Sequence, residues 1–267
     1  MKRTTIAMIV IAIAVIPVMM AIIFSNITRR SEMQSNRITG NGPYVTAKLP
    51  SFRRLTFEEG NTYFVENFPG FKITVSPKAT SPEISAPEEI MPYLKWEATD
   101  NLLTLSTYNS DSLNDVTLKC DRQVILTLPT SPEMVTNNRR TFLTFDSVSC
   151  NFITLQTRGK VTIKDSYFDS IHLNGNDERY YRNLLIQLEG KSAIGMLTVF
   201  DMNRDITLHT DSTSVVKRLT WLGSENSEHT LRLDSATVER FTFVRDGDNS
   251  SIKIVTSDNL ISALSSR

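Results

Sequence analysis

One motif occurs six times between Phe142 and Leu264, and it limits the folds that this chain can adopt. Each copy carries a turn dipeptide with an alternating apolar run on either side. The dipeptides are Asp146-Ser147, Asp165-Ser166, Glu189-Gly190, Asp211-Ser212, Asp234-Ser235 and Asp258-Asn259, at intervals of 19, 24, 22, 23 and 24 residues. Short polar side chains favour turns because they hydrogen-bond to nearby backbone and tolerate unusual dihedral angles.

The runs on either side of each turn have the period of β-strands. Leu143 and Phe145 precede the first turn, for example, and Ile153 and Leu155 follow it. Apolar residues two positions apart lie on one face of a strand. A repeat near twenty residues indicates an architecture in which each unit buries its apolar face against its neighbours. We therefore predict an all-β fold, a parallel β-helix of stacked coils. An antiparallel β-sandwich is the alternative, because it too has short strands and frequent turns.

The amino-terminal segment predicts a membrane anchor. Lys2 and Arg3 precede nineteen uncharged residues, 6–24, with Pro17 among them. At about 1.5 Å per residue this run is about 28 Å long, enough to cross a bilayer core. Since no small-residue cleavage site follows, an uncleaved transmembrane signal anchor is favoured over a cleaved signal peptide. The lipid bilayer is the expected partner of residues 6–24. The expected location is the inner membrane, single-pass, with the C-terminal domain outside the cytoplasm.

Three parts are predicted along the chain. Residues 1–24 form the signal anchor, residues 25–48 a polar linker, and residues 49–267 the β-helix domain. Within the domain, Ser85-Ala86-Pro87-Glu88 matches a capping box and predicts one short helical turn.

Charge and the rarer residue types argue against several kinds of site. The chain has 29 basic and 29 acidic residues and no long Lys/Arg run, so it gives no electrostatic indication of nucleic-acid binding, which usually needs a basic face. Cys120 and Cys150 match no zinc spacing, and we expect two small buried side chains, with a disulfide as the alternative in an exported protein. His172 and His209 fall on different strands of the coil, which predicts solvent-facing residues rather than metal ligands. No catalytic residue, cofactor or metal is predicted.

The turn acids offer an enzymatic alternative. If they stack in one column, neighbouring carboxyls about 4.8 Å apart approach the roughly 5–9.5 Å that glycoside hydrolysis needs. A polysaccharide lyase or glycoside hydrolase is therefore the second hypothesis. Turn chemistry alone also explains Asp followed by Ser, and we expect a protein that is not an enzyme. The acids concerned are Asp146, Asp165, Asp211, Asp234 and Asp258.

The longest interruption of the repeat is a candidate binding loop, residues 174–183. It contains Arg179, Tyr180, Tyr181 and Arg182, and both residue types are favoured at contact sites. A solvated loop with no ligand is the alternative. The sequence thus predicts a non-enzymatic binding or scaffold module of the cell envelope, with a protein or glycan ligand.

Several short motifs before the repeat resemble a known family. They are Leu49-Pro50-Ser51-Phe52, Tyr63-Phe64-Val65, Phe71-Lys72-Ile73-Thr74-Val75, Asn101-Leu102-Leu103-Thr104-Leu105 and Val124-Ile125-Leu126-Thr127-Leu128-Pro129. Together with the repeat, over residues 49–260, this pattern is similar to the "putative auto-transporter adhesin, head GIN domain" family of exported Bacteroidetes proteins. The chain departs from it at Leu55 and at residues 136–140. The resemblance implies a right-handed β-helix in an exported protein and carries over no catalytic residue.

Overall fold

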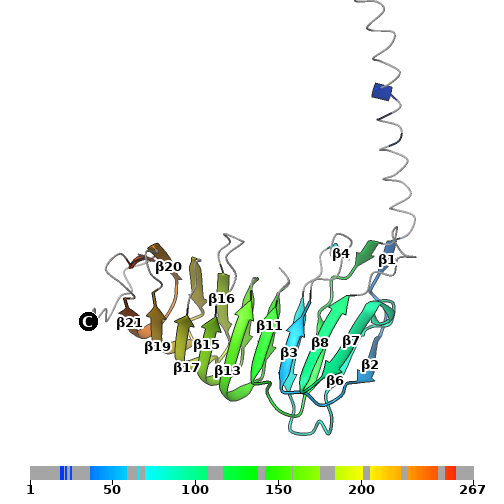
Figure 1. Ribbon diagram of the computed structural model, residues 1–267, viewed down its shortest axis with the longest axis horizontal. Coiled ribbons are helices and arrows are strands. Elements are labelled where there is room, and N and C mark those ends of the chain that lie inside the picture. The colour runs from blue at the N-terminus through cyan, green and yellow to red at the C-terminus, as the bar shows by residue number, and fades with distance from the viewer. Residues whose placement is uncertain are drawn as a thin grey trace, which may run out of the picture.

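The computed structural model describes residues 19–20, 22, 25, 37–58, 65–66, 70–107, 117–137, 142–157, 159–174, 184–200, 205–223, 228–245 and 250–256. Most of the strands belong to two long sheets that run side by side along an elongated stack (Figure 1). From β10 onward, successive strands alternate between the two sheets, so each winding of the chain adds one strand to each. This alternation follows from the paired apolar runs of each sequence repeat.

The first sheet has ten strands. In spatial order they are β2 (Tyr44–Lys48), β6 (Glu83–Pro87), β10 (Val124–Leu128), β5 (Phe71–Val75), β12 (Leu143–Asp146), β14 (Val161–Lys164), β16 (Leu184–Glu189), β18 (Ile206–Thr210), β20 (Glu228–Asp234) and β22 (Ser251–Thr256). All pairs from β10 to β22 are parallel, whereas β2 and β6 pair antiparallel at one end.

The second sheet has nine strands. In spatial order they are β21 (Val238–Val244), β19 (Val215–Leu222), β17 (Ala193–Phe200), β15 (Tyr167–Asn174), β13 (Ser149–Thr157), β11 (Met134–Asn137), β3 (Arg54–Phe57), β8 (Leu102–Thr107) and β7 (Leu94–Thr99). Here β7 pairs antiparallel with β8 at the same end of the stack, and the other pairs are parallel. A small third sheet joins β1 (Arg37–Thr39), β9 (Thr117–Lys119) and β4 (Val65–Glu66).

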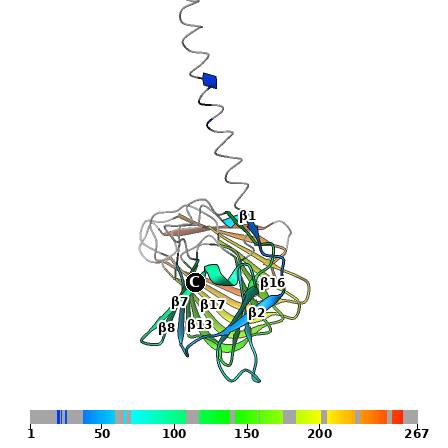
Figure 2. The same cartoon turned by 90° about the vertical axis from the view of Figure 1, so that its right-hand side faces the viewer.

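The amino-terminal windings interleave. Strand β3 lies between β8 and β11, and β5 lies between β10 and β12, although β8 and β10 come later in the chain. The windings therefore stack in an order that differs from the sequence. A 3₁₀ turn, η2 (Met91–Tyr93), contacts β6 here, and Figure 2 looks along the stack from this end. Buried Ile90 and Leu94 on either side of η2 close the core.

Rows of aligned apolar side chains fill the space between the sheets. Because parallel partners are in register, each inward position repeats from strand to strand. From β8 to β19, one row of the nine-stranded sheet is at most 2% exposed, and burying each such side chain contributes about 1.5–3 kcal/mol. It consists of Leu103, Leu55, Val135, Leu155, Leu173, Val199 and Trp221.

Each long strand of the nine-stranded sheet turns a corner. Two consecutive residues face outward between two inward ones, where strict alternation allows only one. In β15, for example, Phe168 and Ile171 are buried while Asp169 and Ser170 are not. The outward pairs are 151–152, 169–170, 195–196, 217–218 and 239–240. The coil thus bends at the same place in five successive windings.

Buried serines stabilise the turns that follow the ten-stranded sheet. Ser192 Oγ donates to the carbonyl oxygens of Glu189 (2.7 Å) and Ile163 (3.0 Å) and accepts from the N–H of Ser166 (3.2 Å). Ser166 Oγ accepts in the same way from the N–H of Val148 (3.0 Å). Each hydroxyl therefore satisfies backbone groups of the preceding winding that would otherwise be buried without partners.

The fold class predicted from the sequence needs correction in its transmembrane helix and in its first windings. The described chain is all-β with two mostly parallel sheets, and its first windings interleave and carry antiparallel strands that the predicted parallel β-helix did not include. The alternative, an antiparallel sandwich, is wrong, because parallel pairs dominate both sheets. The predicted helical turn at Ser85 is also wrong: this residue lies in β6, and its Oγ hydrogen-bonds Thr46 Oγ1 of β2 at 2.8 Å.

The predicted membrane anchor is corrected as well. In the part of the chain that the structure describes, no helix is both long and apolar enough to span a bilayer. Of residues 6–24, only Met19, Met20 and Ile22 are described, and the others lie outside that part. The described residues therefore do not support the predicted single-pass transmembrane helix, the bilayer contact through residues 6–24 or the inner-membrane location.

The serine stack gives a test of this fold. Replacing Ser192 with Ala leaves the Ser166 N–H without its acceptor, which should lower the free energy of unfolding by about 1–3 kcal/mol. The matched control is Ser212→Ala, since Ser212 lies in one of the repeat turns but its side chain is exposed. Urea denaturation monitored by circular dichroism measures both. Equal, small effects for the two variants would contradict a structural role for the buried hydroxyl.

Candidate functional site

The outward face of the nine-stranded sheet carries three parallel rows of side chains beyond the corner. The first row lies just after the bend, and the other two lie two and four residues further along each strand. The rows are Phe152, Ser170, Met196, Arg218 and Arg240; then Thr154, His172, Thr198, Thr220 and Thr242; then Gln156, Asn174, Phe200, Leu222 and Val244. No Asp or Glu occurs in any of these three rows.

Three rings meet on this face. Phe152 of β13 contacts His172 of β15 edge to face, with ring centroids 4.7 Å apart and planes at 84°. The His172 ring in turn contacts Phe200 of β17 at 5.0 Å and 61°. Edge-to-face contact is the favoured geometry for such rings, because the positive edge of one meets the negative face of the other. The three rings form a diagonal across successive strands, called the ring cluster below.

The ring cluster is open to solvent although it is largely apolar. The Phe152 side chain is 45% exposed, and Val244 at the far end of the face is 46% exposed. His172, Phe200 and Leu222 are half-buried. An exposed apolar patch of this kind is a common mark of a binding surface, since leaving it in water is unfavourable.

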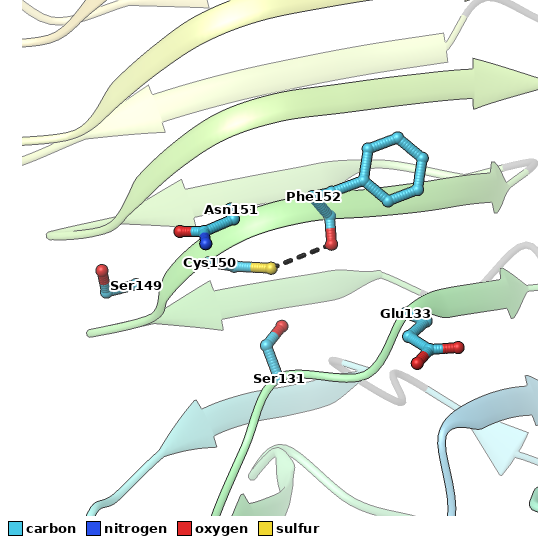
Figure 3. A pocket seen from close by; sticks show the side chains of 6 residues that line it. All are labelled: Ser131, Glu133, Ser149, Cys150, Asn151 and Phe152. Carbon is cyan, nitrogen blue, oxygen red and sulfur yellow. Dashed lines mark hydrogen bonds between the residues drawn. The ribbon is translucent and has the colours of Figure 1, made fainter.

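A shallow depression of about 640 Å³ adjoins the ring cluster (Figure 3). Ser131 and Glu133, before β11, face β13 residues Ser149–Phe152 across it. Its origin lies in the strand lengths: β11 begins at Met134, opposite Thr154, so the first part of β13 extends past its neighbour. The depression thus has a largely polar lining next to Phe152, whose ring points away from Ser131 and Glu133 and contacts His172 of β15 (Figure 3).

The two cysteines are both free. Cys150 lines the depression, and its Sγ donates to the Phe152 carbonyl oxygen at 3.1 Å (Figure 3). Cys120 is buried, and its Sγ donates to the Arg122 carbonyl oxygen at 2.9 Å. Burial raises the pKa of the Cys120 thiol, which keeps it protonated. The expected pair of small buried side chains is therefore found only in part: neither cysteine forms a disulfide and Cys120 is buried, but Cys150 is half-buried.

The histidines do not converge. His172 lies in β15 and His209 in β18, on different sheets, as the repeat predicted. His229 is buried and contacts the rings of Trp221 and Phe243. Across the described ranges, no group of three or more His, Cys, Asp or Glu residues could hold a metal ion.

The turn acids do not form one column. Strand register places Asp146 opposite Lys164 and then Glu189, so a lysine separates the two acids. Asp165 comes one residue after Lys164 and therefore lies outside this row. Asp234 is the register partner of His209. Asp258 lies outside the described residues. The column of carboxyls needed for the enzymatic hypothesis is therefore interrupted in its first three windings.

Two of these acids are also held in the ionised state. Burial opposes ionisation of Asp146, but hydrogen bonds from Lys72 and Ser147 and the charges of Lys72 and Lys164 lower its pKa below 3.8. Burial likewise opposes ionisation of Asp211, but hydrogen bonds from Ser214, Thr213 and the Gly190 N–H lower its pKa. A general acid in glycoside hydrolysis needs a raised pKa, so neither carboxyl suits that role.

The predicted binding loop, with Arg179, Tyr180, Tyr181 and Arg182, lies outside the described residues. The sequence did not indicate the ring cluster, because its members are separated by 20 and 28 residues in the chain. The available signal was the presence of Phe152, His172 and Phe200 at outward positions of alternating runs, where polar residues are usual.

The Lys72–Asp146 ion pair predicts acid sensitivity. Because the pKa of Asp146 is lower in the folded state, its ionised carboxylate stabilises the fold at any pH above 3.8, the pKa in the unfolded chain. This stabilisation is lost as the pH falls through the lower pKa of the folded state. Asp146→Asn should lower the free energy of unfolding by about 0.5–1 kcal/mol at pH 7, and the difference from wild type should decline steadily below pH 4.

Urea denaturation at stepped pH measures this difference. Asp205→Asn is the control, because Asp205 is half-buried and makes no ion pair with another described residue. A difference between wild type and Asp146→Asn that stays constant from pH 7 to pH 2 would refute the ion pair as its source.

Comparison with known proteins finds similarity only at the level of solved structures. No family model matches the chain, and no curated protein matches it. A "putative adhesin" from Bacteroides fragilis is 14% identical, with a TM-score of 0.40, covering 82% of this chain and 97% of its own. A "putative lipid binding protein" from Parabacteroides distasonis is 13% identical, with a TM-score of 0.38 and coverage of 83% and 97%. A "putative adhesin" from Parabacteroides merdae is 13% identical, with a TM-score of 0.37 and coverage of 83% and 96%.

Proposed function

We propose that this protein is a non-enzymatic binding module that holds a glycan on the outward face of its nine-stranded sheet. The observation that carries the proposal is the ring cluster of Phe152, His172 and Phe200, at spacings of 4.7 and 5.0 Å, in which Phe152 is exposed and the other two rings are half-buried. A sugar ring has an apolar face of C–H groups that packs against aromatic rings, while its hydroxyls need hydrogen-bonding partners nearby.

Polar groups that could serve those hydroxyls surround the ring cluster. Thr154 and Thr198 lie on either side of His172 in its row, and Asn174 pairs with Phe200. Ser131, Ser149 and Asn151 line the neighbouring depression. This mixture of one apolar platform with several short polar side chains is typical of sites that fix a small polar ligand.

The regular spacing of the strands favours an extended ligand. Neighbouring strands lie about 4.8 Å apart, so the three rows repeat their side chains at that interval along the stack. One sugar unit of an extended polysaccharide advances by a similar distance. A glycan lying across the strands therefore meets an equivalent set of positions at each winding.

Affinity electrophoresis of the full chain, in gels containing dextran, glucomannan, dextran sulfate or polygalacturonate, tests the proposal. Migration should be retarded by at least one of these polysaccharides. Phe152→Ala and Phe200→Ala should each weaken that binding about three- to tenfold, the equivalent of losing one aromatic contact.

Phe142→Ala provides the matched control. Phe142 is 46% exposed, like Phe152, but it immediately precedes β12 in the other sheet. This variant should bind as wild type does, and all three variants should keep the wild-type urea midpoint. Unretarded wild-type migration in every gel, or an equal loss in Phe142→Ala, would overturn the glycan assignment and favour a protein ligand or a purely structural role.

A further inference from the structure

We infer that the glycan held on this face is acidic, and that Arg218 and Arg240 bind its carboxylate or sulfate groups. This inference rests on the proposed function and adds the charge class of the ligand. The two arginines lie in the same outward row as Phe152, on strands β19 and β21, where they are direct register partners. Both side chains are exposed.

The two guanidinium groups form a like-charged pair. Cations directly opposite each other on neighbouring strands repel, and the pairing is unfavourable unless a counter-charge lies nearby. None of the ion pairs between described residues involves Arg218 or Arg240. An anionic ligand would remove this repulsion, so the free protein presents a site whose charge is unbalanced.

Neighbouring charges leave the site positive. Lys217 and Glu239 precede the two arginines in their strands and are both exposed at the corner. One acid thus faces three bases around this position. The other two rows offer only uncharged side chains at these strands: Thr220, Thr242, Leu222 and Val244.

The arginine side chain suits binding of a carboxylate or sulfate group better than an undirected positive charge would. Its planar guanidinium presents paired N–H donors that match the two oxygens of a carboxylate or sulfate group. Arg218 and Arg240 sit on consecutive windings, about 4.8 Å apart along the stack. A polymer with a charged group on successive units can therefore engage both.

The positions of the ring cluster and the arginine pair along the stack also set a minimum length for the ligand. The ring cluster occupies β13, β15 and β17, and the arginine pair occupies the next two strands, β19 and β21. A chain that contacts both crosses five strands, or roughly 19 Å. In the threonine row, Thr198 is only 7% exposed. Thr154, Thr220 and Thr242 are half-buried and place hydroxyls near both ends of the path.

The inference is tested by comparing how the full chain binds an acidic polysaccharide and the neutral polysaccharide with the same backbone. Dextran sulfate is compared with dextran, and polygalacturonate with its methyl-esterified form, by biolayer interferometry at fixed ionic strength. Wild type should bind at least one acidic polymer roughly tenfold or more tightly than its neutral partner, as charge-assisted hydrogen bonds imply. A response in the sulfate pair only or the carboxylate pair only identifies the anionic group.

Arginine variants separate a built site from general charge attraction. The double variant, which carries both Arg218→Gln and Arg240→Gln, should lose the preference for the acidic polymer and keep the wild-type affinity for the neutral polymer. Arg232→Gln is the control for net charge of the single variants Arg218→Gln and Arg240→Gln, because each removes one positive charge and Arg232 is exposed on β20 in the ten-stranded sheet. Arg232→Gln should keep the preference.

The possible failures are distinguishable. If wild type binds neutral and acidic partners equally, or if Arg232→Gln and Arg218→Gln lose affinity to the same extent, the charge inference is wrong and the glycan proposal stands. If wild type binds no polysaccharide, both are wrong. If the double variant loses neutral and acidic binding together while its urea midpoint is unchanged, the arginines do not determine charge preference.

Discussion

Register between successive windings is the constraint on which the rest of this structure depends. Parallel partners align residue by residue, so an apolar side chain on one strand lies beside an apolar side chain on the next. A slip of one residue would exchange the buried and exposed sets of a whole strand. The same alignment that forms the rows of the core also forms the rows of the outward face, and the ring cluster and the arginine pair are both products of it.

Much of the strand pattern could be predicted from the sequence, but the alignment of the turns could not. Leu143 and Phe145, or Ile171 and Leu173, alternate as expected and are fully buried. Aligning the repeats on their Asp residues, however, places Asp165 opposite Asp146, whereas the strands place Lys164 there. The inward residues determine register because they carry most of the burial energy, and the turns adjust by one or two residues to fit.

The amino-terminal third was harder to predict for a different reason. Its windings interleave, so strands that are neighbours in space, such as β5 and β12, are separated by several others in the chain. Local periodicity contains no information about such pairing. Ser85-Ala86-Pro87-Glu88 illustrates the limit: its residues suit a helix start, but pairing with Tyr44–Lys48 on one side and with β10 on the other holds Glu83–Pro87 extended. The candidate site was missed for a similar reason, since Phe152, His172 and Phe200 meet only when three successive windings have stacked.

The two ends of the stack are built differently, and this has a consequence for how such a protein can change. Interleaved windings and antiparallel strands fix the beginning, whereas from β13 onward each winding pairs only with the one before and the one after. Duplication of one repeat in the gene would therefore lengthen the molecule in its second half without disturbing the first. The rows on the outward face would gain another position at the same spacing, so the protein could evolve to recognise longer chains of the same ligand by simple addition.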